Sequence, residues 1–215
     1  MARPRRHTEE LRARLVARAA ETIGTSGYAR LSLRQLAAVE GTSTAAVYSL
    51  FAGKEGLVDA VFREAFERLG HAQRSTPRTG DAEADLRALG WAYFEWARDN
   101  PHLYAVMLGT SSGEWKPSPE DVQGALGSLA PLQEVVGMLP DLGMPPEAAA
   151  VILWANVHGL ISLAACGALP IDDESLRGLY AESMTTTLRG VRGAAGQASA
   201  GTVAEAASSS AVATS

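Results

Sequence analysis

The sequence has few of the residues that build metal sites and disulfides. It contains one cysteine, Cys166, so no disulfide can form within the chain. That residue lies in an apolar stretch, where we expect a small buried side chain in a reducing compartment. One cysteine cannot complete a sulfur site, and no glycine motif that could hold phosphate occurs. We expect no metal and no cofactor, because the four histidines lack metal-ligand spacing: His7, His71, His102 and His158.

Strand patterns, internal repeats and a secretory signal are also missing. Apolar residues recur at helical spacing along the chain, which predicts an all-α fold. The basic start runs into Thr8, Glu9 and Glu10 instead of an apolar segment. We therefore expect no secretory signal and a cytoplasmic protein.

One long apolar run is present. Residues 148–169 have no charged side chain over 22 positions, a length sufficient to cross a membrane. Asn156, His158 and Ser162 lie near its middle, however, and lipid would leave their polar atoms without partners. We expect instead a helix that packs within its own domain and against a second copy of the chain.

Charge is divided unevenly along the chain. Residues 1–56 carry nine Lys or Arg and five Asp or Glu, a net of +4, whereas the remainder carries ten and nineteen, a net of −9. A basic segment suits contact with phosphates. Arg3, Arg5 and Arg6 precede the first predicted helix with no acidic residue among them. We expect residues 1–8 to form a flexible arm that lies along DNA.

Two short helices joined by a tight turn are predicted over residues 32–57. Ser32, followed three residues later by Gln35, fits a capping box, so a helix begins there and ends near Gly41. Glycine tolerates the left-handed backbone that a sharp turn often requires. Ser43 is placed to cap the second helix. The pattern is typical of a helix-turn-helix, whose second helix reads the major groove of DNA.

The two helices have an inner and an outer face. Apolar residues are expected to hold them together: Leu36, Ala37, Val47 and Phe51. On the outer face, Thr44 and Ala45 are candidates for base contacts, and the Tyr48 phenol is within reach of a phosphate. Lys54 begins the next predicted helix, where the helix dipole disfavours a cation, so we expect a phosphate partner. The predicted DNA-binding residues are Arg5, Arg6, Arg34, Ser43, Thr44, Ala45, Tyr48 and Lys54.

Roughly the first sixty residues resemble the DNA-binding domain of TetR-type transcriptional regulators. The resemblance is carried, in order, by residues 19–23 with Gly27 and Tyr28, by residues 32–41 and by residues 47–57. It implies a three-helix head, a larger helical effector domain, dimerisation, and release of DNA on ligand binding.

Two residues depart from that family's pattern at the turn. Glu40 stands where a small apolar residue is usual, and Thr42 stands where valine is usual. We expect these departures to loosen the turn slightly or to change its approach to phosphates, and so to affect DNA affinity more than fold.

Proline and glycine divide the rest of the chain into predicted helices. The predicted helices, including the first, span residues 9–26, 54–70, 81–100, 101–108, 118–139, 145–166 and 172–191. Few large side chains occur from residue 193 on, which predicts a disordered tail. The expected domains are a basic arm (1–8), a helix-turn-helix head (9–53), an effector-binding and dimerisation body (54–192) and the tail (193–215).

Small residues in the long apolar helix predict a contact with a partner helix. Ala155 with Gly159, and Ser162 with Cys166, lie four residues apart and permit close approach. The expected dimer-interface residues are Ala155, Gly159, Ser162, Cys166, Tyr180 and Met184.

Trp154, His158 and Gly159, with residues 100–104 and Met107, resemble the effector domain of a TetR subgroup known for a Trp-His-Gly (WHG) signature. This implies that the last two long helices form a four-helix interface between two copies. Aromatic and sulfur-bearing side chains at helical spacing either belong to the core or line a pocket, and both alternatives stay open. A pocket here would favour a small apolar or aromatic effector with one or two polar groups. The candidate ligand-binding residues are Tyr93, Phe94, Tyr104, Met107, Trp154 and His158.

The main prediction is a homodimeric repressor that binds an inverted-repeat operator and is released from it by a ligand. Two other functions compete with this prediction. Residues 109–113 match Gly-x-Ser-x-Gly, with His158 later in the chain, but a hydrolase nucleophile at Ser111 needs a preceding strand, and none is predicted. A ligand-binding dimer with a degenerate head is the second alternative, suggested by Glu40 and Thr42. We expect a DNA-binding regulator and no enzyme.

Overall fold

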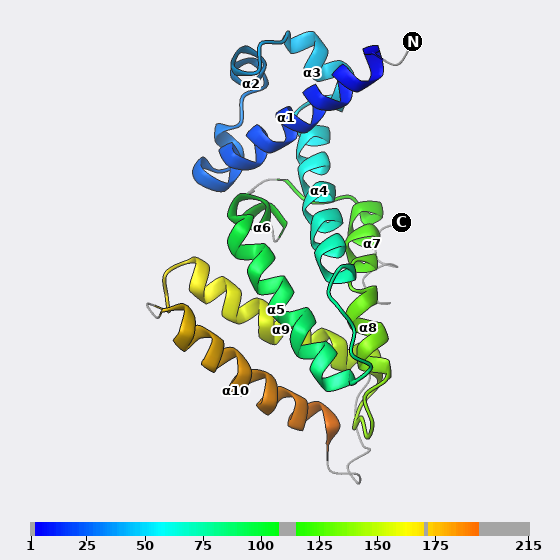
Figure 1. The fold of residues 1–215 in the computed structure, drawn as a ribbon. Coiled ribbons are helices and arrows are strands. Elements are labelled where there is room, and N and C mark those ends of the chain that lie inside the picture. Colours follow the sequence, from blue (N-terminus) through cyan, green and yellow to red (C-terminus); the bar gives the residue numbers. More distant parts are fainter. Residues whose placement is uncertain (1–2, 108–114, 170–171, 194–215) are drawn as a thin grey trace, which may run out of the picture.

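The protein is helical throughout the part of the chain that the structure describes. The computed structural model describes residues 3–107, 115–169 and 172–193 (Figure 1). Within these ranges the regular elements are ten α-helices and one 3₁₀ turn, with no strand, which confirms the all-α class. The predicted tail from residue 194 on and the segment around Ser111 lie outside the described residues.

Three helices form the head, residues 3–53: α1 (Arg3–Ser26), α2 (Leu33–Val39) and α3 (Thr44–Phe51). A 3₁₀ turn, η1 (Tyr28–Arg30), joins α1 to α2. The backbone expected to be a flexible arm up to residue 8 is helical from Arg3, so that prediction is wrong. Pro4 does not prevent this, because a proline in the first helical turn removes an N–H that would lack a helical partner anyway.

The helix α4 (Lys54–Arg74) runs from the head into the body, residues 54–193 (Figure 1). It continues one turn beyond the predicted end near Gly70. Leu69 and Gln73 of this last part are buried on one face, so tertiary packing keeps the final turn helical.

The next two helices follow each other closely. Asp81 caps α5 (Ala82–Asp99) by accepting hydrogen bonds from the Glu83 and Ala84 N–H groups, at 2.9 and 3.1 Å. Pro101 then begins α6 (Pro101–Met107). This short helix packs against α1. A Cβ atom at Gly24 would lie 2.9 Å from the Cα of His102, so the absence of a side chain permits this approach.

The single helix predicted over residues 118–139 is two helices, α7 (Pro119–Gly127) and α8 (Ala130–Gly137). Ser128 and Leu129 separate them, and the Ser128 hydroxyl donates to the Ala125 carbonyl at 2.7 Å. Pro131 lies in the first turn of α8. Because proline has no N–H and crowds the preceding turn, it begins a new helix here and does not continue the old one.

The last two helices, α9 (Pro146–Ala165) and α10 (Asp173–Arg192), lie side by side at one edge of the body (Figure 1). Asn156 joins them, because its amide donates to the Thr187 hydroxyl and accepts from the Ser183 hydroxyl at 2.7 Å. Among the described helices, α9 is the one long and apolar enough to cross a membrane. Its inner face packs in the body through Ala149, Ala150, Leu153, Val157 and Ile161. Of the residues in the most apolar stretch of α9, 28% are buried.

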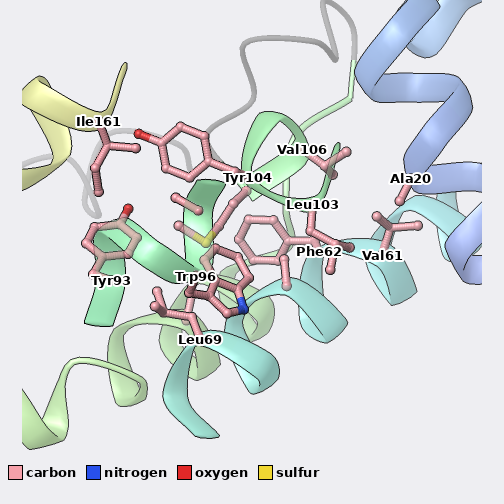
Figure 2. Close-up of a cluster of buried hydrophobic side chains, with 14 of the residues drawn as sticks. Ala20, Val61, Phe62, Leu69, Tyr93, Trp96, Leu103, Tyr104, Val106 and Ile161 are labelled. Atoms are coloured by element: carbon pink, nitrogen blue, oxygen red, sulfur yellow. The ribbon is translucent and has the colours of Figure 1, made fainter. Parts of the chain in front are cut away.

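Head and body share one core. Ala20 of α1, Val61 and Phe62 of α4, and Leu103 and Val106 of α6 gather where these three helices meet (Figure 2). Each large side chain buried in this way contributes about 1.5–3 kcal/mol. The head therefore packs on the body directly, so a displacement of α6 or α4 changes the surface against which α1 packs.

Candidate functional site

The turn between α2 and α3 has the predicted local geometry. The Ser32 hydroxyl accepts from the Gln35 N–H at 3.4 Å, and the Ser43 hydroxyl accepts from the Ala46 N–H at 3.1 Å. Gly41 has φ +67°, the left-handed conformation that glycine adopts without strain. The helix-turn-helix is thus built from two side-chain caps and one glycine.

The outer side of this pair is open. The inner residues Val47 and Phe51 are buried, as are Leu36 and Ala37 of α2. Tyr48 is 55% exposed. The other outward residues are exposed or half-buried: Arg34, Ser43, Thr44 and Ala45. The residues of the turn and α3 that are predicted to read DNA are therefore accessible to solvent in whole or in part.

Glu40, the first departure from the family's pattern, has two arginine partners. Its carboxylate oxygens lie 3.1 Å from Nε of Arg14 and 3.4 Å from Nε of Arg18. Only 10% of the Glu40 side chain is exposed. At the second departure, the Thr42 N–H donates to the Ala37 carbonyl at 2.9 Å. Glu40 therefore ties the turn to α1, in contrast to the loosening we expected there. The Thr42 bond is a backbone bond that valine would also make, so the effect of this departure stays a prediction.

Lys54 has a local partner that sequence reasoning missed. Its Nζ lies 4.1 Å from the ring centroid of Tyr28, a cation–π geometry. No spacing rule connects these residues, because they meet only when η1 folds against the start of α4. Arg5 and Arg6 belong to the first turns of α1, on the backbone that extends toward solvent at one end of the head (Figure 1).

A polar cluster lies inside the body. Nδ1 of His158 is 2.9 Å from the Tyr104 hydroxyl and 3.2 Å from the Tyr93 hydroxyl. Ser162 closes the cluster, with its hydroxyl 2.9 Å from that of Tyr104 and 3.2 Å from Nε2 of His158. Figure 2 shows both tyrosine hydroxyls on the side of Ile161, a residue of α9. Three helices, α5, α6 and α9, therefore meet through hydrogen bonds.

Burial keeps this cluster uncharged near neutral pH. It lowers the pKa of His158 below its usual value, because the imidazolium would lose its hydration. It raises the pKa of Tyr104 to about 12 and raises that of Tyr93 as well. The cluster thus offers neutral donors and acceptors.

The structure divides the six predicted ligand residues. Tyr93, Tyr104 and His158 form the cluster, whereas Met107 and Trp154 border an apolar pocket of about 290 Å³. Phe94 borders neither: its ring packs against Trp91 at a centroid distance of 4.8 Å, so its predicted ligand role is not supported.

Gln73 is a residue of the interior that the sequence analysis missed. It is 4% exposed and borders a second, smaller cavity together with Tyr93 and Trp154. The spacing of Gln73 from Phe66 and Leu69 places it on the buried stripe of α4, and this helical spacing was the signal that could have predicted its burial.

The predicted dimer residues also divide. Ala155 and Cys166 are exposed, and a Cβ at Gly159 would meet nothing within 4 Å. Cys166 is thus not the buried residue we expected. Ser162 points inward to the polar cluster.

Two predicted dimer residues lie in the protomer's own core. Tyr180 and Met184 are 8% and 1% exposed, and the Tyr180 hydroxyl donates to the Arg87 carbonyl at 2.7 Å. Predicting them at a dimer surface is wrong, because they occupy the inner face of α10. The opposite face carries the exposed Leu179.

No group of three or more His, Cys, Asp or Glu side chains suited to a metal ion occurs among the described residues. Besides the Tyr93–Tyr104–His158 cluster, these residues include buried titratable groups with partners of their own. The Asp85 carboxylate accepts from the Thr79 and Gly80 N–H groups, Arg63 pairs with Asp121, and the Tyr180 hydroxyl donates to the Arg87 carbonyl.

Two family models match the chain. Residues 15–61 match the model described as "Bacterial regulatory proteins, tetR family", and residues 86–188 match "Tetracyclin repressor-like, C-terminal domain". No curated protein matches the sequence.

Solved structures match over most of the chain. A protein of unknown function from Rhodococcus sp. RHA1 is 29% identical, with a TM-score of 0.71 over 85% of this chain and 96% of that one. The regulatory protein SCO4313 is 24% identical, with a TM-score of 0.72 over 86% and 98%. The TetR family regulator PfmR from Thermus thermophilus is 20% identical, with a TM-score of 0.62 over 80% and 97%. The last two share the fold.

Proposed function

The chain belongs to the TetR family of bacterial regulatory proteins, and from this premise we propose that it is a cytoplasmic, homodimeric repressor that releases its operator when a ligand binds the body. The observation that carries the proposal is the open outer face of α3, where Thr44, Ala45 and Tyr48 stand clear of the core beside a turn held by caps. A short helix with an exposed aromatic residue, in a part of the chain with net positive charge, is suited to binding in the major groove of DNA.

We assign the DNA contacts to two groups. Thr44 and Ala45 meet base edges, with the alanine methyl suited to a thymine methyl. Tyr48 and Lys54 contact phosphates, as do Arg34 and Ser43 beside the turn and Arg5 and Arg6 in the first turns of α1. The net charge of +4 over residues 1–56 supports this role, although the whole chain carries −5.

The dimer forms through the outer faces of α9 and α10. Val151, Ile152 and Leu163 are 55%, 42% and 45% exposed, and Leu179 of α10 is 39% exposed. Ala155 and Gly159 leave room between them for a second helix. Two copies joined here present two α3 helices, which an inverted repeat with half-sites roughly 34–36 Å apart accommodates.

Ligand binding reaches DNA through α4 and α6. Two hydrogen bonds hold α4 to α7 and to the segment that leads into it: the Trp115 indole N–H donates to Asp59, and Arg63 donates to Asp121 of α7, both at 2.8 Å. A ligand in the adjacent apolar pocket displaces this segment, and the ligand favours the released state only by its tighter binding to that state. The His158 cluster, which includes Tyr104 of α6, supports our proposal that the body belongs to the Trp-His-Gly subgroup.

The deciding experiment is selection of bound sequences from a random DNA pool by the purified full-length protein. We expect enrichment of an inverted repeat with half-sites about one helical turn apart. Absence of any enriched sequence would instead favour a ligand-binding dimer with a degenerate head.

Variants then test the division of contacts. Tyr48→Phe and Lys54→Ala should weaken binding to specific and random duplex alike, and Lys54→Ala should reduce the salt slope by about one. Thr44→Val and Ala45→Ser should change base preference in the same selection. Lys116→Ala removes the chain's other lysine, exposed on the body, and serves as the matched control. Equal losses on both duplexes for all four head variants would refute the division.

A further inference from the structure

Two spaces inside the body share one residue, Trp154. The outer space is the apolar pocket of about 290 Å³, bordered by Phe62, Met107 and Trp115 among others. The inner space of about 20 Å³ is bordered by Gln73 and Tyr93, with leucine, valine, methionine and glycine around them. Trp154 therefore forms part of the wall of both spaces.

Two residues that border the inner space each carry a buried polar atom without a well-formed hydrogen bond. Oε1 of Gln73 has no partner, although this side chain is 4% exposed. Nε1 of Trp154 has no acceptor at full hydrogen-bond geometry, although it interacts with the Tyr93 hydroxyl. A buried polar atom that lost its water without gaining a partner destabilises the protein, so such atoms in a native interior indicate a missing partner. Here one atom needs a donor and the other needs an acceptor.

Charge and size restrict what that partner is. No Lys, Arg, His, Asp or Glu occurs among the described residues that border either space. A carboxylate or ammonium group would therefore be buried without a counter-ion, which is strongly unfavourable. A space of 20 Å³ holds about one water-sized group. A hydroxyl is that small, is neutral, and both donates and accepts.

We propose that the effector is an uncharged, mainly apolar molecule with one hydroxyl group, whose apolar part fills the outer pocket and whose hydroxyl lies between Gln73 and Trp154. The hydroxyl donates to Oε1 of Gln73 and accepts from the Trp154 indole N–H. The inference rests on the proposed function, because it places the effector in the body. The Trp154 ring, which donates this bond, packs 5.9 Å from the His158 ring between centroids, so a ligand held here also lies beside the polar cluster.

The test compares three probes of nearly equal size by isothermal titration calorimetry on the full-length protein. 1-Octanol carries the hydroxyl, 1-methoxyheptane keeps an acceptor and lacks the donor, and octanoate is charged. We expect 1-octanol to bind about tenfold more tightly than 1-methoxyheptane and tenfold or more tighter than octanoate. Equal affinities, no binding of 1-octanol, or a preference for octanoate would overturn the proposal.

Two variants locate the hydroxyl. Gln73→Leu should lower the affinity for 1-octanol about fivefold to tenfold and abolish its advantage over 1-methoxyheptane, because the acceptor for the hydroxyl proton is gone. Trp154→Phe should lower the affinity for both probes by a similar factor, because both lose the indole donor. Unchanged affinity in both variants would mean that an ordered water, and no ligand, satisfies these atoms.

The matched control is Trp96→Phe. Trp96 also has a buried indole N–H without a partner, but it borders neither space. This variant should keep the wild-type preference for 1-octanol. If a cavity variant fails to fold by circular dichroism, the probe series on the unaltered protein still decides the proposal.

The proposed function is tested separately, by DNA selection without any probe. Operator selection with no preference for 1-octanol would remove the effector inference and leave the regulator standing. Selective 1-octanol binding without any selected DNA sequence would remove the proposed DNA-binding function and leave the ligand preference standing.

Discussion

The head and the body treat their polar side chains differently. In the head, Ser32 and Ser43 cap helices, Glu40 meets Arg14 and Arg18, and the outward side chains of α3 stand in solvent. In the body, tyrosine, histidine, glutamine and tryptophan side chains are buried, and some of their polar atoms have no partner. The polar side chains of the head described above thus pair with each other or with the backbone, or lie in solvent, whereas some polar atoms in the interior of the body do not pair.

This difference separates two kinds of recognition. A surface whose supporting hydrogen bonds are already made binds DNA with little reorganisation. An interior with unpaired polar atoms gains stability when a ligand supplies the partners, and that gain can be used to shift the helices around it. α4 and α6 connect the two regions because both pack against α1.

The largest expected effect comes from Gly56→Ala, which should disrupt the head and spare the body. A Cβ at this position would lie 1.9 Å from the Phe51 carbonyl oxygen, so α3 and α4 must move apart. We expect a loss of about 3 kcal/mol in the free energy of unfolding and loss of operator binding. Urea denaturation and gel-shift assays measure these.

Gly124→Ala is the control for this substitution. Gly124 lies within α7, and a Cβ there meets nothing within 4 Å. Alanine should raise stability by about 0.5–1 kcal/mol, since glycine is the poorer helix former. Equal stability of the two variants would contradict the close contact at Gly56.

Gly24→Ala should weaken the contact between head and body. The added methyl would lie 2.9 Å from the Cα of His102, so α1 must move away from α6. We expect a destabilisation of about 2 kcal/mol, in spite of the better helix propensity of alanine. Circular dichroism during urea titration checks it, and an unchanged midpoint would show that the two helices adjust freely.

The His158 cluster should make stability depend on pH. Because burial lowers the pKa of His158 in the folded protein, the unfolded chain binds the proton more readily between that pKa and about 6.5. The contribution of His158 to the free energy of unfolding should therefore be fully present above pH 6.5. As the pH drops below 6.5, the free energy of unfolding should fall by at most about 1.4 kcal/mol per pH unit.

His158→Gln is the comparison for this pH dependence. The variant keeps a hydrogen-bonding side chain and cannot titrate, so its urea midpoint should change less between pH 7.5 and pH 5.5 than that of the unaltered protein. An identical pH profile for both proteins would mean that His158 is protonated as easily when folded as when unfolded.

The smallest expected effect is that of Glu40→Gln, under about 1 kcal/mol. Its partners Arg14 and Arg18 are 49% and 45% exposed, so solvent screens the attraction. The loss should shrink in high salt. Glu64→Gln breaks the Arg68 pair within α4 and is the control, since it joins no two helices. A larger loss in the free energy of unfolding from Glu64→Gln than from Glu40→Gln would show that the ion pairs at the turn stabilise the protein no more than a pair within one helix.

Local signals predicted the head well. Serines at positions 32 and 43 cap helices within three residues, and Gly41 sets the turn by its own backbone, so neighbouring residues decide these features. The helix break at Ser128 was missed, although Pro131 marks it, because the apolar spacing continues across both helices.

Orientation in the body was predicted less well. Tyr180 and Met184 lie on α10 as expected but face inward, since helical spacing alone does not say which apolar stripe packs on the protomer. The two tyrosine partners of His158 come from α5 and α6, more than fifty residues away along the chain. No local rule selects them.

The amino-acid sequence by itself determined the helical class, most helix ends and the composition of the exposed face of α3, because caps, turns and apolar stripes act over a few residues. Tertiary structure alone decided which face of α10 is buried, what Glu40 and Lys54 contact, and that Gln73 and Trp154 border one cavity. These depend on the packing of helices that are distant in the chain, where small differences in approach decide which side chains meet.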